Sequence, residues 1–386
     1  MIMEGYLEVV ELLRELVEID SVNPDLAPDG GGETAIARHV HDWAVAQGLR
    51  SRIVDGGSGR PNILVGGGSA EPDAPRLLLC GHLDTVGVGG ATDPFTPRIE
   101  GDRLYGRGAY DMKAGLAASL VACRDAERLG FPGEVLVAAV ADEENASLGV
   151  QALLPGLRAD AAIVTEPTEL VIGVAHKGFV WTEIEVTGVA AHGSRPHLGV
   201  DAIVRTGPVL VALQELERSL ARREHPLLGP GIVHAGLIQG GQEASTIPER
   251  CVLTIERRTI PGETVSDVEA EVERLLDRCR TADPALVARS RTLLHRPAME
   301  TSPKEPVALA LGGAVRFVRG EDAEVAGMSY WADSAFLAAH GIPTVLFGPG
   351  GEGAHADIEW VSVQDTIDCA RILTETARSL FASLTR

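Results

Sequence analysis

A histidine and an aspartate end the apolar segment 77–85, and their types and spacing could place a metal ligand beside the group that orients it. In an extended segment, residues i and i+2 point to the same face, so His82 and Asp84 should leave the strand end together. Taken alone, such a pair is more often an ordinary histidine at the edge of a core beside an aspartate in a turn. The rest of the chain favours the metal ligand.

Other ligand-type side chains follow apolar segments or glycine-rich turns further along the chain. They are Asp111 after residues 106–110, Glu143 and Glu144 after residues 134–142, Glu166 after residues 161–165, and His355 beyond residues 343–351. In open α/β sheets, sites form just outside the carboxyl ends of strands, so groups far apart in sequence can converge there. We therefore predict that these side chains share one site.

The donor set indicates the chemistry of that site. Two histidines and three or more carboxylates, with no cysteine among them, suit zinc or a similar divalent metal. A carboxylate shared between two ions would allow a two-metal site that activates water and polarises a carbonyl group. One more carboxylate would then be free to act as the base.

The elements that must position these groups alternate between strand and helix patterns. Apolar periodicity predicts helices at 4–19, 33–48 and 112–129, and strands at 61–66, 76–80, 134–141 and 160–165. This alternation implies right-handed crossovers and a mainly parallel sheet flanked by helices, which is an α/β fold.

From Lys177 the pattern changes to alternating apolar and polar residues, which suits a sheet with one face in water. Strands at 179–186, 231–239, 250–258 and 285–293, with helices at 199–223 and 264–280, give the order β-α-β-β-α-β of a ferredoxin-like α+β module. Helices at 304–318, 333–340 and 363–384 and a strand at 343–347 then resume the first pattern. We predict a metal-binding domain of residues 1–177 and 294–386, interrupted by an inserted domain of residues 178–293.

Composition restricts the partners and the compartment. The 386 residues include 34 basic and 55 acidic ones, a net charge of −21 that repels nucleic acids and anionic membrane surfaces. The five cysteines form no Cys-x-x-Cys pair, and we find no basic signal region or membrane-spanning apolar run. We expect a cytoplasmic protein that binds neither nucleic acid nor membrane.

The motifs, taken in order, resemble one family of enzymes over nearly the whole chain. They are Gly-His82-Leu-Asp84-Thr-Val, Gly-Arg-Gly-Ala-Tyr-Asp111-Met-Lys-Ala-Gly, Asp-Glu143-Glu144, Thr-Glu166-Pro-Thr, Ala-His192-Gly-Ser and the late Ala-His355. This set resembles the zinc aminoacylase family, which includes acetylornithine deacetylase, succinyl-diaminopimelate desuccinylase, aminoacylase and carboxypeptidase G. The ordered set is far more specific than any single motif.

The resemblance implies two zinc ions per chain, for which Co²⁺ or Mn²⁺ can substitute. One ion would be held by His82, Asp111 and Glu166, and the other by Asp111, Glu144 and His355. Asp111 would therefore bridge the two ions. The resemblance also implies that the Asp111–Met112 peptide bond is cis.

Catalytic roles are implied in the same way. Asp84 would hydrogen-bond the outer nitrogen of His82, as the strand geometry already suggests. Glu143 would be the general base and then the proton donor to the leaving amine. His192 would stabilise the tetrahedral oxyanion, a residue that the family often takes from the lid of a partner subunit, so the inserted domain would be a lid and dimerisation domain in a homodimer.

Substrate recognition rests on fewer residues. Arg258 matches an arginine that grips the substrate carboxylate, a task suited to a guanidinium fork. Ordinary surface positions remain the alternative for His192 and Arg258, because metal geometry fixes neither of them. Ser245 stands where many family members have asparagine.

The family resemblance predicts a hydrolase that cleaves the amide bond of an N-acyl amino acid, in the manner of acetylornithine deacetylase or succinyl-diaminopimelate desuccinylase. Two alternatives are a peptidase of the same family that acts on short peptides, and a non-catalytic relative that binds metal or a partner. The sequence contains no Gly-x-Ser-x-Gly, His-Glu-x-x-His or Walker motif that would favour another enzyme class.

Overall fold

The computed structural model describes residues 4–384 and divides the chain into two compact units. The first unit extends to Val174 and also contains Thr301–Ala326 and the chain from Ala332 onward. The second unit comprises Ala175–Glu300 and Gly327–Trp331. The short segment 327–331 was not indicated by the sequence pattern, and it packs in the second unit through ring contacts of Trp331 with His176 and Phe179.

A mixed sheet forms the centre of the first unit. Its strands are β1 (Arg50–Asp55), β2 (Pro61–Gly68), β3 (Arg76–His82), β6 (Glu134–Val140), β7 (Ala161–Val164), β8 (Ile172–His176) and β19 (Thr344–Leu346). Their order in the sheet is β1-β2-β6-β3-β7-β19-β8, and the short strands β17 (Met299–Glu300) and β18 (Val325–Met328) also pair with β8. The four central strands β6, β3, β7 and β19 run parallel, so their carboxyl ends reach the same edge. The predicted α/β fold with a mainly parallel sheet is confirmed.

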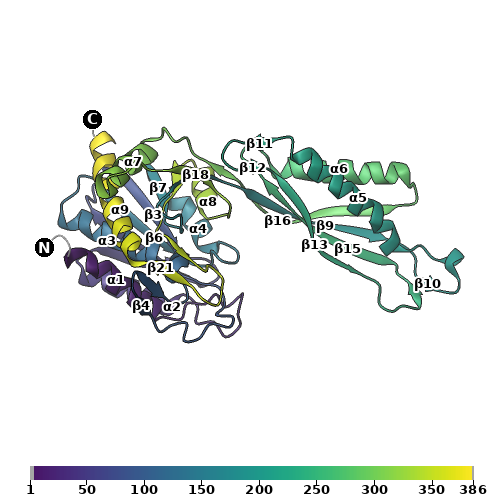
Figure 1. The fold of residues 1–386 in the computed structure, drawn as a ribbon, viewed down its shortest axis with the longest axis horizontal. Coiled ribbons are helices and arrows are strands. Elements are labelled where there is room, and N and C mark those ends of the chain that lie inside the picture. Colours follow the sequence, from purple (N-terminus) through teal and green to yellow (C-terminus); the bar gives the residue numbers. More distant parts are fainter. Residues whose placement is uncertain (1–3, 385–386) are drawn as a thin grey trace. The chain divides into compact units, whose positions relative to one another are not determined.

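Helices cover both faces of this sheet (Figure 1). They are α1 (Glu4–Val17), α2 (Thr34–Ala46), α3 (Ala114–Arg128), α4 (Leu148–Leu153), α7 (Pro306–Arg319), α8 (Ser334–Ala339) and α9 (Val363–Leu384). In β3, Leu77 and Leu79 join a core with α1, α2, α3, α7 and α9, whereas Leu78 and Cys80 join a second core with α4 and α8. The strand is buried on both faces, which explains its uninterrupted apolar sequence.

Some strands had no clear sequence signal. The edge strand β1 pairs antiparallel with β2, and its exposed residues include Arg50 and Arg52, so it lacks the apolar pattern of a buried strand. A small second sheet pairs residues 98–105 with the segment around His355. Its strands are β4 (Arg98–Glu100), β5 (Arg103–Tyr105), β20 (Gly351–Glu352) and β21 (Trp360–Ser362). Pairings between such short segments are decided by tertiary contacts rather than by local sequence.

The second unit has the order β-α-β-β-α-β, as predicted. Its elements are β9 (Gly178–Thr187), α5 (Ala202–Leu220), β13 (Ile232–Gly240), β15 (Arg250–Thr259), α6 (Val265–Ala282) and β16 (Val287–Arg296). The strands form an antiparallel sheet in the order β13-β15-β9-β16, and α5 and α6 pack on one face of it. Strand β9 alternates buried and exposed residues, because only one of its faces lies in the core.

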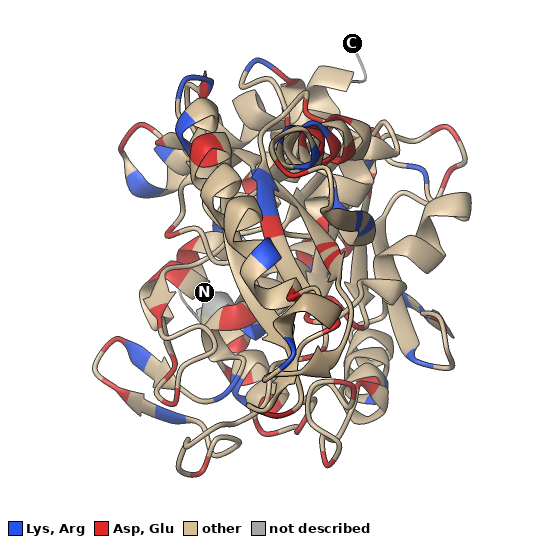
Figure 2. Ribbon diagram, turned by 90° about the vertical axis from the view of Figure 1, so that its right-hand side faces the viewer, with Lys and Arg blue, Asp and Glu red and all other residues tan. Residues whose placement is uncertain are grey.

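Charged residues of both signs are interspersed over the fold, with the acidic excess expected from the net charge of −21 (Figure 2). Among the residues that the structure describes, no helix combines the length and the apolar character needed to cross a membrane.

Candidate metal centre

The predicted ligands come together at one edge of the main sheet, in the first unit. His82 is the last residue of β3, the Glu143–Glu144 pair follows β6, and Glu166 follows β7. Parallel strands deliver these residues to a common edge, as expected for sites in open α/β sheets. Asp111 lies in the irregular turn Ala109–Lys113 before α3, and His355 lies in the loop between β20 and β21.

Asp111 stands between the two histidines. Its Oδ1 atom lies 3.2 Å from Nε2 of His82, and its Oδ2 atom lies 3.4 Å from Nε2 of His355. On the second side, Oε2 of Glu144 lies 3.2 Å from the same nitrogen of His355. Each oxygen of the Asp111 carboxylate therefore faces a different histidine, which is the arrangement that a bridging carboxylate needs.

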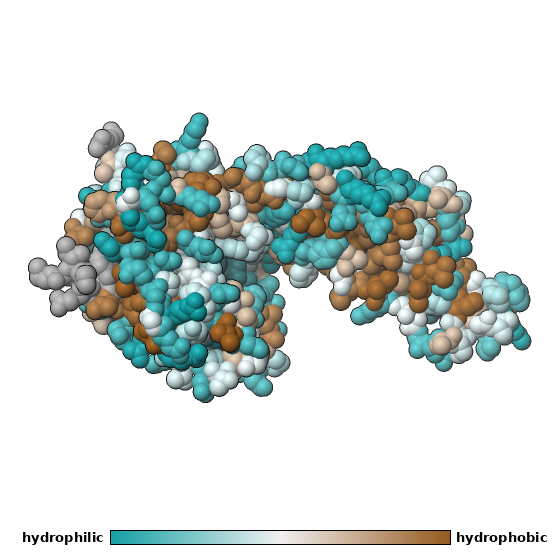
Figure 3. All heavy atoms as spheres, viewed as in Figure 1, coloured by the Kyte–Doolittle hydropathy of each residue, from teal (hydrophilic) through white to brown (hydrophobic). Residues whose placement is uncertain are grey.

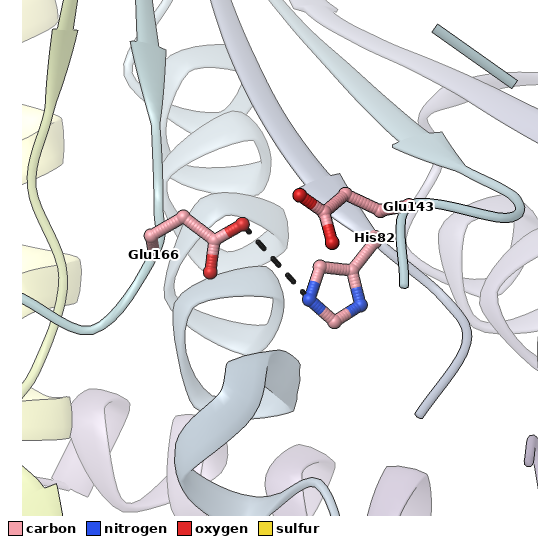
Figure 4. A group of neighbouring side chains, drawn as sticks. All are labelled: His82, Glu143 and Glu166. Atoms are coloured by element: carbon pink, nitrogen blue, oxygen red, sulfur yellow. Dashed lines mark ion pairs between the residues drawn. The ribbon is translucent and has the colours of Figure 1, made fainter. Parts of the chain in front are cut away.

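Two glutamates, Glu143 and Glu166, also lie beside the ring of His82 (Figure 4). Oε1 of Glu166 lies 3.9 Å from Nε2 of His82. Ligand atoms of His82, Glu143 and Glu166 all lie within 4.8 Å of one another, and so do those of His82, Asp111 and Glu144. His82 thus belongs to two donor groups, and Glu143 is close enough to one of them to act on a molecule bound there.

The contacts of Asp84 differ from the predicted ones. Nδ1 of His82 lies 2.8 Å from the main-chain carbonyl oxygen of Asp84, whereas the carboxylate of Asp84 is 3.9 Å from that nitrogen. The carboxylate instead accepts hydrogen bonds from the main-chain amides of Glu143 and Glu144, at 3.1 and 3.2 Å. The predicted hydrogen bond between the Asp84 side chain and the His82 ring was wrong, because the main-chain amides of Glu143 and Glu144 donate to that carboxylate instead.

A residue that sequence reasoning missed holds the loop of Asp111. The buried carboxylate of Glu359 accepts hydrogen bonds from the amides of Gly108, Tyr110 and Asp111, at 2.8 to 3.0 Å. Arg107 also donates to it, at 2.8 Å. No local signal marks Glu359 in the sequence, since its partners lie some 250 positions earlier. The Asp111–Met112 peptide bond is cis, as predicted.

Close packing between α3 and β7 helps to place Glu166. A Cβ atom on Gly115 would lie 1.9 Å from the carbonyl oxygen of Thr165, so only glycine lets the start of α3 pass this close. The hydroxyl of Ser119, one turn later in α3, lies 3.2 Å from the Thr165 hydroxyl. The helix therefore rests directly on the strand end that carries the glutamate.

The electrostatics of the cluster call for a cation. Burial and the neighbouring charges raise the pKa of Glu143, and burial and Asp111 raise that of Glu144. Hydrogen bonds with Asp111 and Glu144 raise the pKa of His355 to about 10. Oε1 of Glu144 is buried and has no hydrogen-bond partner among the described residues. A divalent cation would neutralise the carboxylates and supply the missing partner, so these residues fit a metal centre.

His192 and Arg258 belong to the second unit. His192 is exposed on the short strand β10 (Ala191–His192), and its Nδ1 atom accepts a hydrogen bond from the amide of Ser194 at 3.2 Å. In the neutral ring, the proton is therefore on Nε2, which is free to donate. The carbonyl of Ser245 accepts the amide of Gly193 at 2.7 Å, a main-chain contact that does not depend on the side chain at position 245.

Arg258 already has a carboxylate partner. Its Nε atom donates to Oε1 of Glu256 at 2.7 Å, and the guanidinium lies 5.2 Å from the centre of the Phe179 ring. The indole of Trp181 donates to the other oxygen of Glu256, also at 2.7 Å. A carboxylate is thus bound by this arginine in the structure, although it comes from the chain itself.

Comparisons with known proteins agree with the motifs. Residues 78–379 match the model of peptidase family M20/M25/M40. The chain is 33% identical to acetylornithine deacetylase of Myxococcus xanthus, over 83% of this chain and 84% of that protein. It is 28% identical to N-formyl-4-amino-5-aminomethyl-2-methylpyrimidine deformylase of Bacillus subtilis, over 95% and 93% of the two chains.

A solved structure shares the fold. The YXEP protein of Bacillus subtilis, described as a dinuclear metal binding peptidase, superimposes with a TM-score of 0.76 at 16% identity and covers 97% of this chain and 98% of its own. Together, these matches confirm the family resemblance that the ordered motifs predict.

Proposed function

Because this chain belongs to peptidase family M20/M25/M40, we propose that it hydrolyses the amide bond of an N-acyl amino acid with two divalent metal ions, of which zinc is the expected one. The position of Asp111 between His82 and His355 carries the proposal, since one carboxylate facing two imidazoles suits a two-metal site. The acetylornithine deacetylase at 33% identity supports the substrate class.

The assignment of ligands follows the family resemblance and is supported by the distances. His82 and Glu166 would hold one ion and Glu144 and His355 the other, with Asp111 contributing to both. The bound ions supply Lewis acidity that polarises the amide carbonyl and lowers the pKa of a water molecule. Zinc, cobalt and manganese are all compatible with this set of nitrogen and oxygen donors.

Glu143 moves the protons. It takes a proton from the attacking water, whose oxygen forms the new bond to the acyl carbon, and delivers a proton to the amide nitrogen as the C–N bond breaks. The products are a carboxylate and a free amine. The position of Glu143 supports this role, because its carboxylate lies within 4.8 Å of the ligand atoms of His82 and Glu166.

Two residues of the second unit complete the proposal. His192 donates a hydrogen bond from Nε2 to the oxyanion, and Arg258 grips the substrate carboxylate. The proton position in the neutral ring of His192 supports the first role. The hydrogen bond from Arg258 to Glu256 supports the second role, because a carboxylate already accepts from this guanidinium.

The second unit, predicted as the inserted domain 178–293, also provides the surface for a homodimer. Strand β13 is an edge of its sheet, with exposed Leu237 and Ile238, and α5 next to it exposes Val204 and Val211. Figure 3 shows hydrophobic surface over this part of the unit. An edge strand beside an apolar helix face suits pairing with a second copy of the same chain around a two-fold axis.

A panel of substrates tests the proposed function. The chain is reconstituted with Zn²⁺, Co²⁺ or Mn²⁺ and assayed against N-acetyl, N-formyl and N-succinyl amino acids and against dipeptides. We expect metal-dependent release of the amino acid from at least one N-acyl compound, and two metal equivalents per chain. Turnover of dipeptides alone would favour the peptidase alternative, and a metal-loaded protein that cleaves none of them would favour a binding protein.

A further inference from the structure

A network of buried side chains binds the turn that carries the two adjacent glutamates, Glu143 and Glu144. The Asp84 carboxylate is 1% exposed and accepts the amides of Glu143 and Glu144. Its Oδ2 atom also accepts a hydrogen bond from Nδ2 of Asn23 at 2.8 Å. Asn23 lies in the loop after α1, so a residue near the start of the chain orients the carboxylate that fixes this turn.

Asp142, the residue before the glutamates, is the second point of attachment. It is fully buried and has a φ of 67°, a left-handed conformation that is uncommon among non-glycine residues but is adopted more readily by aspartate than by most. Its Oδ1 atom accepts Nδ2 of Asn23 at 3.1 Å and Nη1 of Arg60 at 2.5 Å. Asn23 and Arg60 therefore fix the position of Asp142, the residue directly before Glu143.

Arg60 is itself fixed by two further carboxylates. Its side chain is 11% exposed, and it contacts Asp25 at 2.9 Å and pairs with the buried carboxylate of Glu33 through both Nε and Nη2. The guanidinium therefore has a single orientation, which aims Nη1 at Asp142. None of these residues belongs to the donor groups of the metal centre.

We propose that Asn23 and Arg60 are positioning residues that set the direction of Glu143 and Glu144 through Asp84 and Asp142. This inference rests on the proposed function for its effect on rate, although the positioning itself does not depend on it. A network with only a structural role would stabilise the fold as a whole. Its loss would then change amide exchange at Glu143 and Glu144 no more than the loss of another buried ion pair would. The two readings predict different results for amide exchange and for kcat.

The variants are Asn23→Asp, Asn23→Ala and Arg60→Ala. Asn23→Asp keeps the shape of the side chain but places a third carboxylate against Asp84 and Asp142, so it alters charge without leaving a cavity. Arg124→Ala is the matched control. Arg124 is also a buried guanidinium, with 3% of its side chain exposed, and it pairs with Glu8 and Asp125 rather than with the turn.

Two readouts are measured on each full-length variant. Hydrogen exchange of the amides of Glu143 and Glu144 is followed in the metal-free protein, and kcat, KM and metal content are measured after reconstitution. We expect amide exchange to become about 10- to 100-fold faster and kcat, measured at saturating metal, to fall by a similar factor with unchanged KM, since hydrogen bonds to charged groups are lost. Guanidinium at millimolar concentration should restore part of kcat in Arg60→Ala and leave Arg124→Ala unaffected.

The outcomes separate the inference from the proposed function. If the three variants exchange these amides no faster than Arg124→Ala does, or keep kcat within twofold of the unaltered chain, the positioning role is wrong. If Arg60→Ala does not fold, Asn23→Asp decides the question. If the unaltered chain cleaves no substrate, the proposed function fails, while amide exchange at Glu143 and Glu144 still decides whether the network positions the turn.

Discussion

The imidazole of His82 is oriented by the main-chain carbonyl of Asp84 and not by its carboxylate, with 2.8 Å from Nδ1 to the carbonyl oxygen and 3.9 Å to the carboxylate. A main-chain oxygen cannot be removed by substitution, so the His82 nitrogen that faces Asp111 should keep its direction when the side chain at position 84 is changed. The Asp84 carboxylate is therefore available to accept hydrogen bonds from the main-chain amides of Glu143 and Glu144.

Asp84→Asn should therefore keep its metals and lose rate. An asparagine has one acceptor oxygen in place of two, so one of the amides of Glu143 and Glu144 loses its partner, and we expect kcat to fall about 10- to 100-fold. Metal analysis and steady-state kinetics check this. Asp102→Asn is the control, because the Asp102 carboxylate also accepts two bonds, from Ser362 and Gln364, away from the metal centre. Loss of metal with normal turnover of the remaining loaded chains would contradict the expectation.

The adjacent glutamates should respond differently to substitution. Glu143→Ala should retain both metals and bind substrate but lose roughly 10²–10⁴-fold in kcat, since it removes the proposed general base. Glu144→Ala should weaken one metal selectively, because its Oε2 atom faces His355 at 3.2 Å. Metal content and rate are measured for both variants. A Glu143→Ala protein that sheds a metal, beside a Glu144→Ala protein that keeps two, would reverse the assignment.

The proposed dimer can be tested on the edge strand β13. Leu237→Glu places a charge on a side chain that is 62% exposed, and burying that charge between two copies would be unfavourable. We expect sedimentation to show a dimer for the unaltered chain and a monomer for the variant, with unchanged metal content. Leu309→Glu on α7 is matched, because Leu309 is also 62% exposed but lies in the first unit. If both variants remain dimeric, the interface lies elsewhere.

Acid should destabilise the fold in part through His176. Burial lowers the pKa of His176 to about 4, whereas the unfolded chain protonates this residue near 6.5. The unfolded state thus binds the proton first, so the contribution of His176 to stability is complete above pH 6.5 and is lost as the pH falls toward 4, by roughly 3 kcal/mol in all. Denaturant unfolding of the metal-free protein between pH 7 and 5 should show a shallower decline for His176→Gln.

The sequence predicted the main elements well, because most of them carry apolar patterns of sufficient length. The buried strand β3 and the helices α1 and α9 are examples, and the ligands at strand ends follow from the same reasoning. The partners of these ligands could not be predicted. The bonds of Glu359 to the loop of Asp111, and of Arg60 to Asp142, join segments whose order along the chain says nothing about their distance in space.

A partly correct prediction shows the same limit at a single residue. The period of two placed Asp84 on the same side as His82, but it could not tell that the amides of a turn 59 positions later compete for the carboxylate. Periodicity gives the direction of a side chain, and the hydrogen-bond donors that it meets depend on the tertiary structure.

The place of β19 in the sheet has a consequence for biosynthesis. This strand lies between β7 and β8, which are close to each other in sequence, and it starts only at residue 344. A nascent chain must therefore complete the whole second unit before the gap between these two strands can be filled. His355 and Glu359 are made later still, so the proposed metal centre cannot assemble until residue 359 has left the ribosome. Until β19 has emerged, β7 and β8 lack the strand that lies between them, and unpaired strand edges favour aggregation.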